Sequence, residues 1–438
     1  MAYPACFPPL TRARCLALLA LVLECALALR VLAAGAVQWH VDRRLAAKGK
    51  ICLFADAQIY WDLGGAIEEG RTYQVMQYDV PHFALRTPAY PAFLAACRLL
   101  FGDRLLPARL VQAVLGAATV GLLAWLVERV SPWPGVGWPV SLLAAALAAV
   151  EPFLVGTSAL LLSEALFLPL STLMLACAAM AWPATGTGRR WWAWAFGAGV
   201  SAGLAVLSKP SWALFPPLLA LAWLVLAGQG RRKRAFAGGL LMGLGLTAAM
   251  APWWVRNAEV FGRFVPTALW MGASLYDGLS PTATGASDMR FLDAGDLIAL
   301  DERAQDAELT RRSLAFARAN PSRVLELAAI KARRFWSPWP NAEEFGSRAL
   351  AVASATVTLP VYALMLAGVW DRRRDARALV LLAGPLLYFA ALHMVFVSSM
   401  RYRVAGLVPA LGLAAIGLGR LLDWGLPRAR GEPPPDAG

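Results

Sequence analysis

Residues 105–127 read LLPARLVQAVLGAATVGLLAWLV, an apolar run interrupted by one charged residue, Arg109. As a helix rising 1.5 Å per residue, a run of this length crosses the roughly 30 Å hydrocarbon core of a membrane. Similar runs recur along the 438-residue chain, which is 59% hydrophobic and 16% charged, with a mean hydropathy of +0.54. This composition excludes a soluble globular protein, and the runs lack the period-two alternation of a β-barrel. The sequence therefore predicts an all-α polytopic membrane protein.

About ten transmembrane helices are predicted. We expect the first, near residues 15–37, to be a retained anchor, because it is too long for a signal peptide and carries Glu24 and Arg30. The others lie near residues 105–127, 138–154, 160–182, 191–207, 211–228, 235–254, 349–370, 378–397 and 404–422. We expect residues 1–422 to form one transmembrane domain, interrupted by a first loop (residues 38–104) and a second loop (residues 256–348). Residues 427–438 are expected to be a disordered tail.

Basic residues predict the orientation of the chain, because Lys and Arg near span ends are retained in the cytoplasm. One set of short connections is strongly basic, including the cluster at residues 231–234, whereas the opposite set holds only Lys209, Arg401 and Arg403. Both termini are therefore predicted to be cytoplasmic and both long loops extracytoplasmic, at a bacterial inner or plasma membrane. The same sorting explains the net charge of +13, so we expect a lipid bilayer and no nucleic acid as partner.

The six cysteines form no CxxC pair and have no histidine spacing typical of a zinc site. Cys52 and Cys97 fall in the first loop and either pair in an oxidising compartment or remain free thiols. Free, partly buried thiols are the favoured interpretation.

In the first loop, Asp56-Ala57-Gln58-Ile59-Tyr60 opens a predicted helix that ends near Glu69, with Gly70 as its stop. Asp56 and Tyr60 are four residues apart and share one helix face near the N-terminus, where backbone N–H groups favour an ionised carboxylate. Such a carboxylate could act as a base. The alternative is that Asp56 only caps the helix.

The first loop continues through His82 and the segment Arg86-Thr87-Pro88-Ala89-Tyr90-Pro91. Prolines at positions 81, 88 and 91 predict a defined, non-helical path. Arg86 either binds a phosphate or lies against lipid headgroups, and His82 is expected to be a packed loop residue. In the second loop, residues 301–336 predict two helices lying against the membrane domain, separated at Asn320-Pro321.

Several charged residues end spans on the outward side of the membrane, where charges are costly and usually functional or paired. The simplest use for them is one outward-facing pocket. Separate snorkelling at the interface would explain the Lys and Arg residues but explains Glu164 less well. The expected pocket gathers Asp56, Glu164, Lys209, Arg256, Arg401 and Arg403.

The order of these features resembles the GT-C superfamily of integral membrane glycosyltransferases. The similarity is to bacterial relatives of dolichyl-phosphate-mannose protein mannosyltransferases, lipid A aminoarabinose transferase and rhizobial lipopolysaccharide glycosyltransferases, and it covers residues 16–422. It rests on Asp56 to Tyr60, Gly70, Arg86 to Pro91, Phe101-Gly102, Ser163-Glu164, Lys209-Pro210, Pro252 to Asn257 and Arg401 to Arg403.

This resemblance implies an inverting glycosyltransferase that moves a sugar from a polyprenyl-phosphate carrier to a cell-envelope acceptor on the outer face. Asp56 would be the base that deprotonates the acceptor hydroxyl. Tyr60 and Glu164 would belong to the substrate site. The cations Arg86, Lys209, Arg256, Arg401 and Arg403 would neutralise charge on the leaving phosphate.

Ala57 stands where one common form of the family motif has Glu directly after Asp, which weakens the case for a second acid or a metal there. We expect no metal and no cofactor. The rival class is a polytopic transporter or a flippase of lipid-linked sugars. Such a protein would favour ionisable groups near the bilayer midplane and an internal repeat of its halves, and the sequence shows neither clearly.

Overall fold

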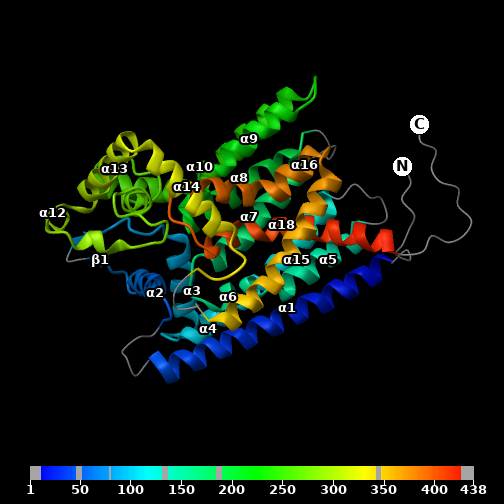
Figure 1. Cartoon of the computed structure of the whole chain (residues 1–438), viewed down its shortest axis with the longest axis horizontal. Coiled ribbons are helices and arrows are strands. Elements are labelled where there is room, and N and C mark those ends of the chain that lie inside the picture. Colours follow the sequence, from blue (N-terminus) through cyan, green and yellow to red (C-terminus); the bar gives the residue numbers. More distant parts are fainter. Residues whose placement is uncertain are drawn as a thin grey trace, which may run out of the picture.

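The computed structural model describes residues 11–45, 52–77, 80–130, 137–183, 190–341 and 347–425. Within these residues the chain is a bundle of long helices with a helical cap at one end (Figure 1). The predicted all-α polytopic membrane fold is confirmed. The predicted tail at residues 427–438 lies outside the described residues.

Eight helical stretches among the described residues are long and apolar enough to cross a membrane. One of them, Ala376–Val395, contains the short helix α16 (Ala376–Ala378), a π-helical turn (Leu379–Ala383) and α17 (Gly384–Val395). The other seven are α1 (Arg12–His40), α4 (Leu105–Val130), α7 (Glu164–Ala181), α8 (Trp191–Ser208), α10 (Arg232–Phe261), α15 (Arg348–Arg372) and α18 (Met400–Gly425).

The predicted count of about ten is too high for regular spans, because two predicted segments differ. The segment near 138–154 is a pair, α5 (Gly137–Val150) and α6 (Pro152–Ala159), bent by 56°. Pro152 cannot continue the helix, and the Glu151 carboxylate caps α6 by accepting from Leu154 N at 2.7 Å. Counted as one span, this pair brings the total in the described chain to nine.

The segment near 211–228 contains a 3-10 turn (Pro210–Trp212) and α9 (Phe215–Leu226). The 12 residues of α9 reach about 18 Å, less than the hydrocarbon thickness. This helix nevertheless returns the chain from the end of α8 to the start of α10 (Figure 1).

The start of α1 and the end of α18 lie at the same end of the bundle in Figure 1, because the nine spans of the described chain and the short return helix α9 together make an even number of passes. Both long loops lie at the other end. In the first loop a π-helical turn (Val41–Leu45) precedes α2 (Ala55–Glu68), β1 (Val75–Gln77), β2 (Val80–His82) and α3 (Ala89–Phe101). The second loop holds α11 (Met271–Gly278), a 3-10 turn (Met289–Asp293), α12 (Gly295–Ile298), α13 (Glu302–Ala319) and α14 (Pro321–Trp336).

The loop helices follow local sequence signals. Helix α2 ends as predicted, and Gly70 has a φ of 65°, a left-handed conformation that suits glycine. The second-loop tract divides at Asn320 as predicted, with Pro321 in the first turn of α14, where its missing N–H costs nothing. The expected non-helical path around the prolines is wrong for Pro91, which lies in the first turn of α3 for the same reason.

Strands β1 and β2 pair antiparallel, with Val75 opposite His82 and Gln77 opposite Val80. In the chain this small ribbon lies between α2 and the segment that carries Arg86.

Helices α8 and α10 pack closely against one another. A Cβ added to Gly199 of α8 would lie 2.0 Å from Met242 O of α10, so only glycine permits this approach. The ends of α8 and α10 that lie nearest the two long loops carry Lys209 and Arg256, two of the predicted site residues.

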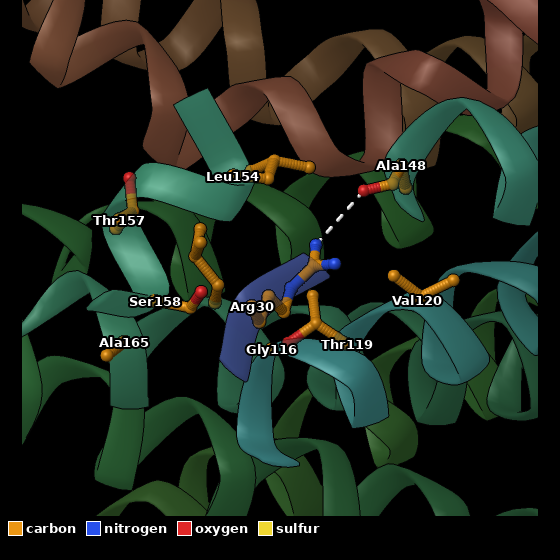
Figure 2. Close-up of a pocket in the computed structure, with 10 residues that line it drawn as sticks. Arg30, Gly116, Thr119, Val120, Ala148, Leu154, Thr157, Ser158 and Ala165 are labelled. Carbon is orange, nitrogen blue, oxygen red and sulfur yellow. Dashed lines mark hydrogen bonds between the residues drawn. The ribbon is translucent and has the colours of Figure 1, made fainter. Parts of the chain in front are cut away.

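Arg30 lies within the membrane-spanning part of α1, is 1% exposed and is partnered by main-chain carbonyls. Its guanidinium donates to Ala148 O at the end of α5 (Figure 2) and to the neighbouring Ala149 O, each at 3.1 Å. Those carbonyls lack helical partners because the helix breaks at Glu151. A cavity of about 10 Å³ beside Arg30 has room for about one water molecule. Arg30 therefore stabilises the bend.

Candidate active site

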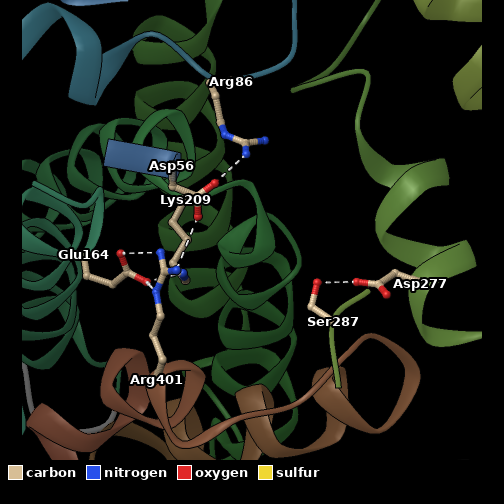
Figure 3. Close-up of polar contacts among 7 residues, drawn as sticks. All are labelled: Asp56, Arg86, Glu164, Lys209, Asp277, Ser287 and Arg401. Atoms are coloured by element: carbon tan, nitrogen blue, oxygen red, sulfur yellow. Dashed lines mark hydrogen bonds and ion pairs between the residues drawn. The ribbon is translucent and has the colours of Figure 1, made fainter. Parts of the chain in front are cut away.

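Asp56 lies in the first turn of α2 and forms ion pairs instead of capping the helix. The N-cap residue is Phe54, whose side chain forms no capping hydrogen bond. The Asp56 carboxylate accepts from Arg86 Nη2 at 2.9 Å and from Arg401 Nη1 at 3.3 Å (Figure 3). The capping alternative is therefore wrong in this structure, and Asp56 is held for interactions outside its own helix.

Glu164 is the first residue of α7, and its side chain is only 1% exposed. It accepts from Arg401 Nε at 3.1 Å and from Lys209 Nζ at 3.1 Å. Lys209 directly follows α8, and Arg401 lies in the first turn of α18. The consecutive helices α7 and α8 and the distant helix α18 therefore meet at the Glu164 carboxylate (Figure 3).

We call Asp56, Arg86, Glu164, Lys209 and Arg401 the ion cluster. Its three cations exceed its two carboxylates, which gives a formal charge of +1 and a local preference for an anion. The side chains of Asp56 and Arg401 are 36% and 35% exposed, whereas that of Glu164 is 1% exposed. Asp56 is thus the solvent-accessible acid of the cluster, and Glu164 is its buried counter-ion.

The charges of the cluster hold Asp56 and Arg86 in their ionised forms. Burial alone would raise the pKa of Asp56, but Arg86 and Arg401 outweigh burial and hold this pKa below its usual value. Burial likewise acts to lower the pKa of Arg86, and Asp56 more than offsets it, so that this pKa is raised. Asp56 therefore enters any reaction at neutral pH as a carboxylate.

Aromatic rings surround the cations. The Arg86 guanidinium carbon lies 5.9 Å from the centre of the Tyr60 ring and 5.5 Å from that of Trp270, within the range of cation–π attraction. Lys209 Nζ lies 5.7 Å from the ring centre of Tyr402. Tyr60 is buried as well, and its ring meets that of Tyr90 edge-on at 5.0 Å.

The structure does not bring Arg256 or Arg403 into the ion cluster. Arg256 Nη1 donates to Phe83 O at 2.8 Å and its Nη2 to Tyr73 O at 3.1 Å. The predicted six-residue pocket is therefore correct in placing Asp56, Glu164, Lys209 and Arg401 together, with Arg86 as a further member. It is wrong in its inclusion of Arg256, which braces the first-loop backbone.

Arg403 is 2% exposed and lies among the second loop and α15. Its Nη1 donates to Ser337 O at 2.8 Å and to Tyr362 Oη at 2.5 Å. Residues 401 and 403 are too close in the sequence to share one helix face, so Arg403 points away from Arg401. Its inclusion in the predicted pocket is also wrong.

Three residues near the site were not found from the sequence: Tyr73, Trp270 and Glu302. Tyr73 Oη donates to Arg86 O at 3.0 Å, and Glu302 accepts from the backbone of the segment before Arg86. Glu302 follows the helix cap Asp301 and resembles any acidic first-turn residue. Because its partners lie more than 200 residues away, local sequence carried no signal for them.

The predictions for His82 and for the two cysteines of the first loop are confirmed. His82 is 2% exposed and packed, with Nδ1 2.9 Å from Val80 O and Nε2 3.2 Å from Gln305 Oε1. Cys52 and Cys97 are free and buried, as favoured from the sequence.

In the second loop Ser287 Oγ donates to Asp277 at 2.7 Å, outside the ion cluster (Figure 3). Among the described residues, no three His, Cys, Asp or Glu side chains gather as a metal site would require.

Comparison with solved structures identifies the fold. AglB, the oligosaccharyltransferase of Archaeoglobus fulgidus, tethered to an acceptor peptide containing the NVT sequon, is 15% identical and aligns with 94% of this chain and 50% of its own, at a TM-score of 0.59. The complex of AglB with an inhibitory peptide and a dolichol-phosphate is 14% identical and aligns with 95% of this chain and 52% of its own, at 0.53. The chain thus spans about half the length of that enzyme.

ArnT from Cupriavidus metallidurans bound to undecaprenyl phosphate is 16% identical, with 92% of this chain and 78% of that chain aligned and a TM-score of 0.44. No curated protein matches the chain significantly.

These comparisons show that the chain has the fold of an oligosaccharyltransferase. Residues 85–255 are similar to the family model described as dolichyl-phosphate-mannose-protein mannosyltransferase. The matched range begins just before Arg86 and includes Glu164 and Lys209.

Proposed function

We propose that this protein transfers a sugar from a polyprenyl-phosphate carrier to a hydroxyl group of a cell-envelope acceptor, which is a lipid, a glycan or a protein. The observation that carries this proposal is the pairing of one partly exposed carboxylate, Asp56, with two cations, Arg86 and Arg401. A transfer of this kind needs a base for the acceptor and cations for the phosphate at one place.

Asp56 accepts the proton of the acceptor hydroxyl as its oxygen attacks the anomeric carbon from the face opposite the phosphate. The bond between the anomeric carbon and the phosphate oxygen breaks, and its electron pair leaves with the polyprenyl phosphate. The new glycosidic bond has inverted configuration, and the balance requires neither a redox partner nor a cofactor.

Charge on the departing phosphate must be neutralised as it develops. Arg86, Arg401 and Lys209 would supply that neutralisation, with Glu164 holding the latter two in place. Tyr60 would form part of the wall of the donor site beside Arg86. Arg256 and Arg403, whose donors are used on backbone and Tyr362 oxygens, would act as braces.

The orientation of the site follows from the charge sorting described above. The termini would be cytoplasmic, and the ion cluster would face the outside of the inner or plasma membrane. Nucleotide sugars are confined to the cytoplasm, so a lipid-linked sugar is the donor that suits such a site. The complex of AglB with a dolichol-phosphate shows that a protein of this fold accommodates a polyprenyl phosphate.

The test uses purified full-length protein with radiolabelled polyprenyl-phosphate sugars and envelope extracts as acceptors. We expect consumption of the lipid-linked sugar with release of polyprenyl phosphate, and no use of nucleotide sugars. Turnover of a nucleotide sugar alone would overturn the proposal. Movement of an intact lipid-linked sugar across vesicles, without its consumption, would instead indicate a flippase.

A further inference from the structure

The backbone just before Arg86 is held by a buried carboxylate from the second loop. Glu302 is the first residue of α13 and is 4% exposed. Its Oε2 accepts from Phe83 N at 2.7 Å and its Oε1 from Ala84 N at 2.9 Å. Both oxygens are therefore used on two consecutive peptide groups.

The same short segment is fixed from other sides. Arg256 donates to Phe83 O at 2.8 Å, and Leu269 N donates to Ala84 O at 2.9 Å. Tyr73 Oη donates to Arg86 O at 3.0 Å. Because the Arg86 guanidinium must reach Asp56 at 2.9 Å, and a hydrogen bond is lost within a few tenths of an ångström beyond its usual length, the backbone of residues 83–86 needs this restraint.

We propose that Glu302 is a positioning residue, which fixes the backbone of Phe83 and Ala84 and thereby sets Arg86 against Asp56 and the donor phosphate. The proposal rests on the proposed function, because the donor phosphate is the ligand assigned to Arg86. It means that the second loop controls a cation supplied by the first loop.

The surroundings of Glu302 give this role a pH dependence. Burial raises the pKa of Glu302 to about 7, although the two backbone N–H groups and Arg256 of α10 oppose the rise, and Asp306 of α13 adds to it. His82 of β2 and Gln305 of α13 line the same small cavity, and burial lowers the pKa of His82. Protonation of Glu302 turns one acceptor oxygen into a donor hydroxyl. Binding of the polyprenyl-phosphate ligand should therefore weaken as the pH falls through about 7.

The Glu302→Gln substitution tests whether both side-chain oxygens of Glu302 are needed as hydrogen-bond acceptors. The amide keeps one carbonyl oxygen, but its NH₂ group must face a backbone N–H that also donates. Glu308→Gln is the matched control on the same helix, because Glu308 pairs with Arg311 and Arg312 of α13.

The experiment compares the full-length parent, Glu302→Gln, Glu308→Gln, Arg86→Ala and the Glu302→Gln/Arg86→Ala double variant in lipid nanodiscs. Hydrogen exchange in peptides covering residues 80–88 reports on the backbone, and binding of undecaprenyl phosphate between pH 5.5 and 8.5 reports on Arg86. In Glu302→Gln we expect exchange at Phe83 and Ala84 to be roughly tenfold faster and binding at pH 8.5 roughly tenfold weaker, as loss of one charged hydrogen bond implies.

Two further results are expected. The decline in binding below about pH 7 should disappear in Glu302→Gln but persist in Glu308→Gln, and Glu302→Gln should cause no further loss in the Arg86→Ala background. Unchanged exchange at residues 83–84, unchanged binding, or additive losses in the double variant would each overturn the proposal. If the parent binds no polyprenyl phosphate, the proposed donor is wrong, and the exchange comparison alone decides whether Glu302 holds the segment.

Discussion

The Arg401 guanidinium lies 3.3 Å from the Asp56 carboxylate, although 345 positions separate the two residues in the chain. Arg401 also pairs with Glu164, so one cation joins a partly exposed acid to a buried one. The three helices α2, α7 and α18 therefore share a single electrostatic junction. Substitutions in this junction have distinguishable expected effects.

Asp56→Asn tests the base. Asn keeps the shape of the side chain and an acceptor oxygen for Arg86, but it no longer accepts a proton. Transfer should fall roughly 100-fold or more while expression and folding are unchanged.

Asp62→Asn is the control for this substitution. Asp62 lies on the same helix, is exposed and contacts Gln58 at 2.8 Å, so we expect a mild effect. The measurement is sugar transfer by both variants in one detergent. Full activity in Asp56→Asn would remove the catalytic assignment.

The same Asp56→Asn variant should bind the donor phosphate more tightly than the parent. In the free protein Asp56 occupies Arg86 and Arg401, and an incoming phosphate competes for both cations. Loss of the carboxylate charge leaves the cations to the phosphate, with an expected gain in affinity of roughly tenfold. Titration with undecaprenyl phosphate measures it, and a weaker affinity would show that Asp56 does not compete with the phosphate.

Glu164→Gln should lower stability, because Lys209 and Arg401 would share a site without their buried counter-ion. Breaking a buried ion pair by removal of one partner costs about 3 kcal/mol or more. Thermal unfolding of the purified protein measures the loss.

Glu326→Gln provides the comparison, because the 60% exposed Glu326 pairs with Arg323 at the surface of the second loop. An exposed pair of this kind contributes about 1 kcal/mol or less. Equal melting temperatures for the two variants would mean that Glu164 is not needed to hold the cations.

The orientation can be tested with single cysteines at glycines that have open space around them. Gly228 lies between α9 and α10, and Gly295 begins α12 in the second loop; an added Cβ meets nothing within 4 Å at either position. In intact cells a membrane-impermeant maleimide should label Gly295→Cys above the parent background and leave Gly228→Cys unlabelled. Labelling of Gly228→Cys from outside would invert the topology.

Metal dependence is also open to measurement. Ala57 occupies the position directly after Asp56, at which a second acid would favour a metal site. We therefore expect sugar transfer to persist in a strong chelator. Transfer assays with and without EDTA, each followed by addition of Mg²⁺ or Mn²⁺, measure it. Complete loss of transfer that returns with added metal would contradict this expectation.

Local sequence determined the parts of this protein that depend on short-range physical chemistry. Hydropathy alone located the spans, since crossing a hydrocarbon layer demands about 20 apolar residues wherever the helix packs. Helix signals located α2 with Asp56 on its first turn and the break at Asn320. The predicted number of regular spans was too high, because Pro152 and the capping Glu151 bend one predicted span and α9 is too short to cross the membrane.

Tertiary structure alone decided which charged side chains meet. Arg256 and Arg403 are cations near the ends of predicted spans, as Lys209 and Arg401 are. Their guanidinium groups nevertheless contact backbone carbonyls of other segments. Glu302, an ordinary first-turn acid by sequence, reaches the backbone beside Arg86. The reason is geometric: a long side chain pairs with whichever group the packing of α2, α7, α8, α13 and α18 places within about 3 Å, and no local pattern encodes that distance.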